Sequence, residues 1–133
     1  MERRRVVITG LGAVTPIGLT AGESWQAVKD GVCGIAPITQ FDASAQKVKL
    51  AAEVKDFVPE NYLPKPEIKR MGRFTQFAVV CAREAMADSG LVTENEDLDR
   101  CGVIISSGIG GLNTLHFEGI KGYEKGYDRI SPF

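Results

Sequence analysis

The sequence has no apolar run approaching the roughly 20 residues that a membrane-spanning helix needs. It has one histidine, His116, so it cannot supply a metal site built from several histidines. Its three cysteines, Cys33, Cys81 and Cys101, lack C-x-x-C spacing. This argues against a zinc site or a disulfide framework and favours the reducing cytoplasm. A net charge of −1 gives no reason to expect nucleic acid or a membrane as a partner.

The composition, 44% hydrophobic and 25% charged, is that of a soluble globular protein. A chain of 133 residues is long enough for one domain with a hydrophobic core and too short for two ordinary ones, so we expect a single domain over 1–133. Strand-like runs alternate with helical patterns, which predicts an α/β fold. The predicted strands lie at 4–10, 50–54 and 101–106, and the predicted helices run from 20 to a stop at Gly31, over 67–89, and over 112–123.

These predicted strands and helices rest on local sequence patterns. The runs at 4–10 and 101–106 are almost continuously apolar, which is typical of strands covered on both faces. Thr20 and Glu23 have the spacing of a capping box at a helix start. Apolar residues recur every three or four positions through 67–89, so we expect that helix to be buried over much of its circumference and to end at the glycine that follows.

The first glycine motif, Gly10-Leu-Gly12, follows an apolar run, as dinucleotide-binding motifs do. A dinucleotide fingerprint needs a third glycine and a helix beginning inside the motif. Here Thr15 takes the third glycine position and Pro16 follows, a pairing that favours extended backbone. The motif therefore predicts a strand that bends at its glycines and binds no dinucleotide.

The second glycine cluster, Ser106 to Gly111, precedes a predicted helix. Backbone N–H groups at a helix start suit an oxyanion, and glycine lets a ligand come close. The cluster lacks the lysine of a P-loop, so hydrolysis of a nucleoside triphosphate is not expected. The pattern leaves a ligand site and a structural tight turn equally open.

None of the cysteines has the partner pattern of a nucleophile. Cys81 falls on the apolar stripe of the long helix and is predicted to pack in the core, Cys101 begins a predicted buried strand, and Cys33 lies in a loop. We predict that all three are non-catalytic. The lone histidine is expected on the surface or at an interface.

Four cations, Lys65, Lys69, Arg70 and Arg73, gather at the predicted start of the long helix. Positive charge is unfavourable at a helix N-terminus, by a few tenths to about 1 kcal/mol per group. The cluster is therefore either a solvated face or a docking site for an acidic partner, and the pattern leaves both open.

Several segments together resemble one family. They are R-R-V-V-I-T-G-L-G-A-V-T-P-I-G at 4–18, G-V-C-G-I at 31–35, F-D-A-S at 41–44, A-x-E-V-K-D-F at 51–57, A-x-x-D-S-G-L at 85–91, S-S-G-I-G-G at 106–111 and R-I-S-P-F at 129–133. In this order and spacing they resemble the opening of the β-ketoacyl-[acyl-carrier-protein] synthases, in particular the bacterial branch called synthase II. The similarity extends over essentially the whole chain.

The resemblance implies an α/β chain that forms the N-terminal part of a thiolase-like α-β-α-β-α sandwich, incomplete because the chain covers about the first third of the family's length. The family is an acyltransferase family of fatty-acid synthesis: a cysteine takes an acyl group as a thioester, and two histidines assist decarboxylation of malonyl-carrier before a Claisen condensation. The chain contains no T-A-C segment and no second histidine. We therefore expect no catalytic residue in it and no activity from it alone.

The resemblance also assigns roles to residues that are present. Gly108 and Ile109 match the acyl pocket, and Phe133 matches a segment that reaches the pocket of the partner subunit in a homodimer. Carrier-facing basic residues are matched by Lys65, Lys69, Arg70 and Arg129, although Pro66 stands where the branch commonly has another basic residue.

The implied partner is an acidic acyl carrier protein, which a cationic cluster would complement. No metal or organic cofactor is implied beyond the phosphopantetheine that the carrier bears, and the implied location is the cytoplasm. Two alternatives remain: a polyketide ketosynthase or its chain-length factor, and a non-enzymatic module that binds a carrier protein.

Overall fold

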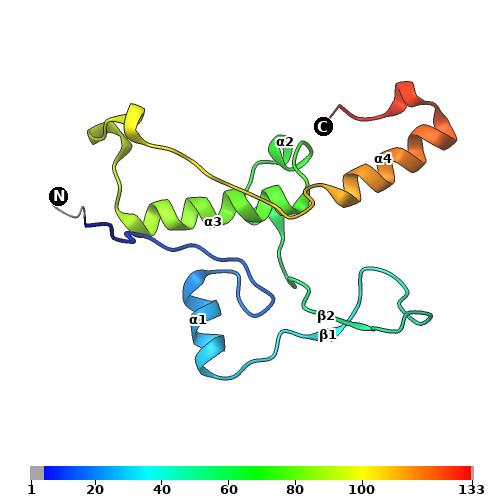
Figure 1. Cartoon of the computed structure of the whole chain (residues 1–133), viewed down its shortest axis with the longest axis horizontal. Helices are drawn as coiled ribbons and strands as arrows, with labels where there is room; N and C mark the ends of the chain where they lie inside the picture. Colours follow the sequence, from blue (N-terminus) through cyan, green and yellow to red (C-terminus); the bar gives the residue numbers. More distant parts are fainter. Residues whose placement is uncertain (1–4, 133) are drawn as a thin grey trace. The chain divides into compact units, whose positions relative to one another are not determined.

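The computed structural model describes residues 5–132 (Figure 1). Contacts divide this part of the chain into two units, one of residues 5–58 with Val80–Leu91 and one of Pro59–Val79 with 92–132. The assignment of all 133 residues to a single domain stays a prediction. The helices are α1 (Ala21–Lys29), α2 (Lys65–Ile68), α3 (Arg73–Ser89) and α4 (Leu112–Lys125), the strands are β1 (Ala36–Pro37) and β2 (Leu50–Ala51), and short 3-10 turns lie at η1 (Pro59–Asn61), η2 (Thr93–Asn95), η3 (Leu98–Arg100) and η4 (Tyr127–Arg129).

The capping box at the start of α1 is confirmed, with one variation. The Glu23 N–H donates to the Thr20 hydroxyl at 3.1 Å, which satisfies one of the unpaired N–H groups of the first turn. The Glu23 carboxylate accepts from the Leu19 N–H at 2.8 Å, one residue before the N-cap residue that a standard box would use. The helix ends at Lys29, and Gly31 follows in the left-handed region with φ +68°.

The strand predicted at 50–54 is shorter than expected and covers only Leu50–Ala51, which pairs antiparallel with β1. Beyond Ala51, hydrogen bonds to the Glu53 side chain replace the backbone pairing. Its carboxylate accepts from the Thr39 hydroxyl at 2.6 Å, the Thr39 N–H at 3.1 Å and the Gln40 N–H at 3.3 Å. The bond from the Thr39 hydroxyl is the main reason that the pKa of Glu53 lies below its usual value.

The long helix predicted over 67–89 is broken into α2 and α3, with Lys69–Gly72 between them. The apolar spacing continues through this break, so periodicity alone could not reveal it. The buried Gln76 side chain joins the two sides by donating to the Met71 carbonyl at 3.1 Å and the Ile68 carbonyl at 3.4 Å. The predicted burial is also wrong: Val80 is buried, but Phe74 is exposed.

The buried strands predicted at 4–10 and 101–106 are wrong for the described residues. Residues 5–10 and 101–106 are extended but form no ladder, and their apolar side chains face solvent, with Val6 90% and Ile104 98% exposed. Arg4 lies outside the described residues. A continuous apolar run predicts a strand between two layers, but a strand also needs a neighbouring strand to share its hydrogen bonds, and within residues 5–132 neither run pairs with one.

No helix in this described range is long and apolar enough to cross a membrane.

Candidate functional site

The first glycine motif serves close packing on α3. A Cβ at Gly10 would overlap the Ala85 carbonyl oxygen, and one at Gly12 would overlap the Cys81 carbonyl oxygen. Only glycine lets the extended segment lie this near the helix backbone. The first glycine motif therefore lies against α3, and its lack of dinucleotide binding stays a prediction.

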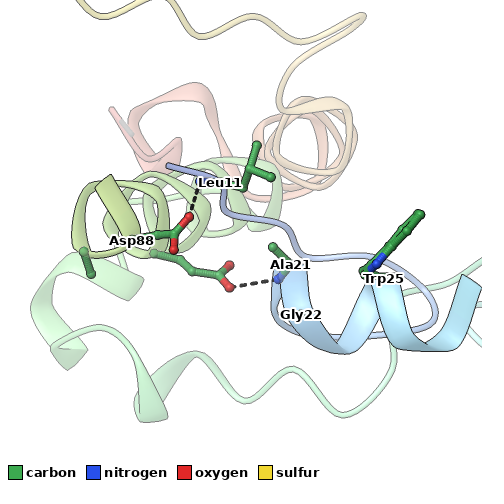
Figure 2. Close-up of a pocket in the computed structure, with 7 residues that line it drawn as sticks. Leu11, Ala21, Gly22, Trp25 and Asp88 are labelled. Carbon is green, nitrogen blue, oxygen red and sulfur yellow. Dashed lines mark hydrogen bonds between the residues drawn. The ribbon is translucent and has the colours of Figure 1, made fainter. Parts of the chain in front are cut away.

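Two carboxylates on α3 bind this segment, and Figure 2 shows the bond between Asp88 and Leu11. Asp88 accepts from the Leu11 N–H at 2.9 Å, while Glu84 accepts from the Ala13 N–H at 2.9 Å and from the Ala21 N–H at 2.8 Å. Ala21 is the first residue of α1, so Glu84 also places negative charge at that helix start. The two carboxylates border a hollow of about 520 Å³ that Trp25 also lines.

These carboxylates were not singled out from the sequence. Their spacing of four residues puts both on one face of α3, which is a detectable signal. Their partners, however, lie 63 to 77 residues earlier in the chain, and no local pattern names them.

The structure gathers three of the four predicted carrier-docking residues. Lys65, Lys69 and Arg70 are exposed and, with Pro66, line a hollow of about 350 Å³. The segment that presents them is anchored just before α2, where Leu63 is only 4% exposed and its N–H donates to the Pro59 carbonyl at 2.9 Å.

The expected unfavourable position at a helix N-terminus is wrong for Lys69. The residue is the C-cap of α2, so it faces the negative end of a short helix. A cation is favourable there, and the expected cost of several cations at one helix start does not arise. Of the four cations, Arg73 begins α3, and its guanidinium lies 5.1 Å from the centre of the Phe77 ring.

Arg129 lies in η4, on an exposed turn where its guanidinium is 3.4 Å from the Asp128 carboxylate. The hollow at α2 is lined by Lys65, Pro66, Lys69 and Arg70 and not by Arg129. The role of Arg129 in docking stays a prediction.

The second glycine cluster leads into α4 as expected. The Gly110 N–H donates to the Ser107 hydroxyl at 3.0 Å, and Gly110 has φ +78°. Gly108 has open space where a side chain would project, and Ile109 is 76% exposed. The acyl-pocket role of Gly108 and Ile109 stays a prediction, and Phe133 lies outside the described residues.

The next residues after Ile109 begin a small hollow of about 170 Å³. Gly110 and Gly111 line it together with Gly72 and Phe74, all within the unit of Pro59–Val79 and 92–132. The bend at Gly110 and the break before α3 thus face each other across a concave surface.

The cysteines show no arrangement for catalysis. Cys81 is half-buried, and burial raises the pKa of its thiol, which disfavours the thiolate. Cys33 and Cys101 are exposed, so Cys101 does not begin a buried strand. His116 is an exposed residue of α4, as predicted. Among residues 5–132 no group of three metal-ligating side chains is assembled.

Solved structures define the class. The ishigamide ketosynthase/chain length factor matches with a TM-score of 0.76 and 30% identity over 98% of this chain and 33% of that one. A type II polyketide synthase ketosynthase in complex with its acyl-carrier protein (AntDE:AntF) matches with the same TM-score at 22% identity. The fold is therefore ketosynthase-like, which is consistent with the α/β class.

Sequence comparison gives the family. The model of the β-ketoacyl synthase N-terminal domain matches residues 3–132, and the chain belongs to this family. The 3-oxoacyl-[acyl-carrier-protein] synthase 2 of Synechocystis sp. is 47% identical over 133 residues, which is all of this chain and 32% of that protein. The chain thus spans about a third of the length of the curated relatives it matches.

Proposed function

We propose that this chain is the N-terminal part of a β-ketoacyl-[acyl-carrier-protein] synthase that lengthens acyl chains by two carbons in fatty-acid synthesis. The observation that carries the proposal is the match along all 133 residues to a synthase 2 at 47% identity. The chain would supply surfaces for the carrier and the acyl group. The nucleophilic cysteine and the histidines would come from sequence beyond it, so the 133 residues alone would be inactive.

In the proposed reaction an acyl group passes from its carrier to a cysteine as a thioester. Malonyl-carrier then loses carbon dioxide, and the resulting carbanion attacks the thioester carbonyl and releases the cysteine thiolate. The enzyme would be a cytoplasmic homodimer with the complete five-layer sandwich. It would need no cofactor of its own, because the phosphopantetheine arm belongs to the carrier.

The cationic cluster supports the part of this proposal that concerns the carrier. Lys65, Lys69 and Arg70 project from one short, anchored segment and border one hollow. Such a surface complements an acidic protein, and rim charges of this kind mainly steer association. The AntDE:AntF structure provides a related case, since in it a ketosynthase is in complex with its acyl-carrier protein. Arg129 would extend the same docking surface.

The acyl pocket would be formed around Ile109, with Phe133 contributed by the partner subunit. The support lies in the open approach at Gly108 and in the exposure of the Ile109 side chain. An apolar side chain beside glycine backbone suits the wall of a fatty-acyl tunnel.

A second candidate is a polyketide ketosynthase or chain-length factor, which the ishigamide match at 30% identity favours. A third, a carrier-binding module without activity, would share the same cationic cluster. These candidates differ in the reaction that the full-length protein would catalyse.

The test incubates the full-length protein with a saturated acyl-carrier and malonyl-carrier and follows the products by mass spectrometry. One added two-carbon unit bearing a β-keto group supports the proposal. Repeated condensation without reduction would support the polyketide candidate, and carrier binding without any product would support the module. The 133-residue chain, run in parallel, should give no product.

A further inference from the structure

The chain turns back after α4 and lies against that helix. Gly126 caps α4 with φ +101°, and its N–H donates to the Gly122 carbonyl at 3.0 Å. The turn η4 follows at once. Since φ +101° is strained for any residue with a side chain, Gly126 defines where the direction changes.

The returning segment, residues 127–131, fits a notch on α4. Gly122 is buried, and a Cβ there would lie 2.8 Å from the Ile130 Cδ1 atom and 3.1 Å from the Tyr127 Cδ1 atom. Both side chains therefore contact the helix at a position that has no side chain of its own. This contact sets how closely the segment lies on α4.

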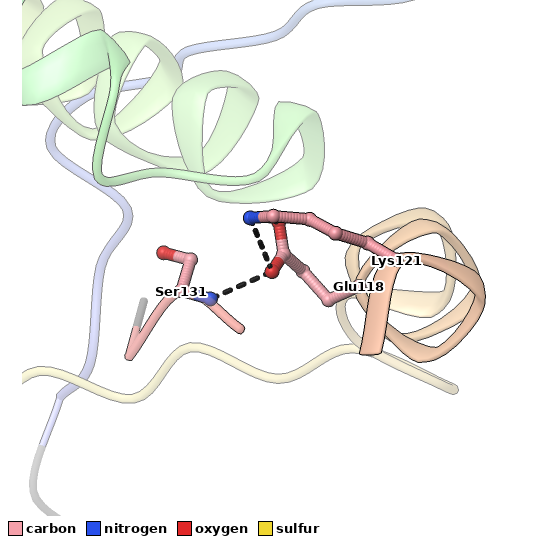
Figure 3. Close-up of polar contacts among 3 residues, drawn as sticks. All are labelled: Glu118, Lys121 and Ser131. Carbon is pink, nitrogen blue, oxygen red and sulfur yellow. Dashed lines mark hydrogen bonds and ion pairs between the residues drawn. The ribbon is translucent and has the colours of Figure 1, made fainter. Parts of the chain in front are cut away.

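A carboxylate of α4 holds the backbone of the same segment (Figure 3). Glu118 Oε2 accepts from the Ser131 N–H at 2.6 Å, and the Lys121 ammonium lies 3.0 Å from that oxygen and 3.2 Å from Oε1. A hydrogen bond to an ionised acceptor is stronger than one between neutral groups. The strength of this contact therefore depends on the charge of Glu118.

The turn inside the segment is bonded internally. The Arg129 N–H donates to the Gly126 carbonyl at 3.1 Å, and the Ile130 N–H donates to the Tyr127 carbonyl at 3.3 Å. The Arg129 guanidinium lies 3.4 Å from the Asp128 carboxylate, and both side chains are exposed. None of these bonds involves a side chain of α4, so the segment can keep its turn when it leaves the helix.

We propose that residues 127–131 form a strap that lifts from α4 about Gly126, and that the Glu118 carboxylate keeps this strap closed. The strap opens locally while α4 stays folded, because it is held through one notch and one carboxylate, whereas the helix has its own ladder of hydrogen bonds. This conformational device does not depend on the proposed reaction.

The charges around Glu118 make the strap sensitive to acid. The Ser131 bond, ahead of Lys121, lowers the pKa of Glu118. Asp128 and Arg129, the charged residues of η4, pair with each other. Since the pKa of Glu118 is lowered in the closed state, the charge stabilises closure at neutral pH, and this contribution is lost as the pH falls through the lowered pKa.

The test uses trypsin, which cleaves after lysine and arginine, on the full-length protein at neutral pH. Cleavage after Arg129 reports on the strap, and cleavage after Lys121 reports on unfolding of α4, since that residue lies inside the helix. Mass spectrometry measures both rates, and each rate follows the population of the open form. Glu118→Ala should raise the rate after Arg129 about tenfold and leave the rate after Lys121 unchanged.

Glu118→Gln keeps a neutral acceptor for the Ser131 N–H, so its rate after Arg129 should fall between those of wild type and Glu118→Ala. Glu124→Ala removes an exposed carboxylate of the same helix and is the matched control, which should behave as wild type. Equal rates after Arg129 in wild type and Glu118→Ala would overturn the proposal. Rates that rise together after Arg129 and Lys121 would also overturn it, because the helix would then open with the strap.

Discussion

Two segments of this chain have the same sequence pattern, an apolar run followed by glycines. They differ in what contacts those glycines in the structure. At 10–13 the glycines lie against the α3 backbone, and the N–H groups of the two residues that follow them, Leu11 and Ala13, donate to carboxylates of that helix. At 106–111, Gly108 and Gly110 border open space, Gly111 lies against Phe74 and Thr114, and the segment leads into α4. A glycine motif therefore indicates that something must approach the backbone, and the surrounding side chains decide whether that is a helix or a ligand.

The largest expected effect tests the close approach at the first segment. Gly12→Ala places a methyl group on the Cys81 carbonyl, and such overpacking should destabilise the full-length protein by about 3 kcal/mol. Gly108→Ala is the matched control, because nothing lies near its added Cβ, and it should stay within about 0.5 kcal/mol of wild type. Urea unfolding midpoints measure both, and equal midpoints would contradict the contrast.

The second prediction concerns Glu84, whose carboxylate binds the segment at 10–13. Glu84→Ala leaves the Ala13 and Ala21 N–H groups without their acceptor and should cost about 2 kcal/mol in the same urea experiment. Glu84→Gln keeps one acceptor oxygen and should cost less. The exposed control Glu124→Ala should be neutral, and a Glu84→Ala protein as stable as this control would show that the fastening is dispensable.

The third prediction concerns the open segment, where the effect should fall on activity and leave stability alone. Ile109→Phe enlarges an exposed side chain at the proposed tunnel wall. It should lower kcat/KM for long acyl-carriers about tenfold and leave short ones unchanged. A chain-length profile identical to that of wild type would remove Ile109 from the pocket wall.

The smallest effect is expected from charge reversal in the exposed cationic cluster. It tests whether this exposed surface, unlike the segment bound to α3, serves association and not stability. Lys69→Glu with Arg70→Glu should raise KM for acyl-carrier several-fold at low salt, and the difference from wild type should shrink as salt rises. Lys47→Glu with Lys49→Glu makes the same charge change on another exposed segment and should leave KM unchanged. Equal KM values for the two double variants would make the cluster a solvated face.

Sequence reasoning succeeded where the determining contacts are local. The Thr20–Glu23 box, the stop at Gly31 and the helix α4 all depend on residues within a few positions of one another. It failed for the runs at 4–10 and 101–106, since strand formation depends on partners that neither run contains.

In the candidate site, too, residues close in sequence could be grouped from the sequence, and contacts between distant residues could not. Three cations of the cluster line one hollow because they are neighbours in sequence, and the docking role that the resemblance implies for them stays a prediction. Glu84 and Glu118 were missed because the backbone groups that they bind lie at separations of 13 to 71 residues. The break between α2 and α3 was missed because apolar spacing continues across it.

Amide hydrogen exchange on the 133-residue chain tests most directly whether the two glycine-bearing segments are held differently. The amides of Leu11 and Ala13, which donate to carboxylates on α3, should be protected, and those of Val103 to Ile105 should exchange rapidly. Equal, rapid exchange in both segments would contradict this. It would mean that the carboxylates of α3 do not hold the first segment, and that its glycines are as open to a ligand as those before α4.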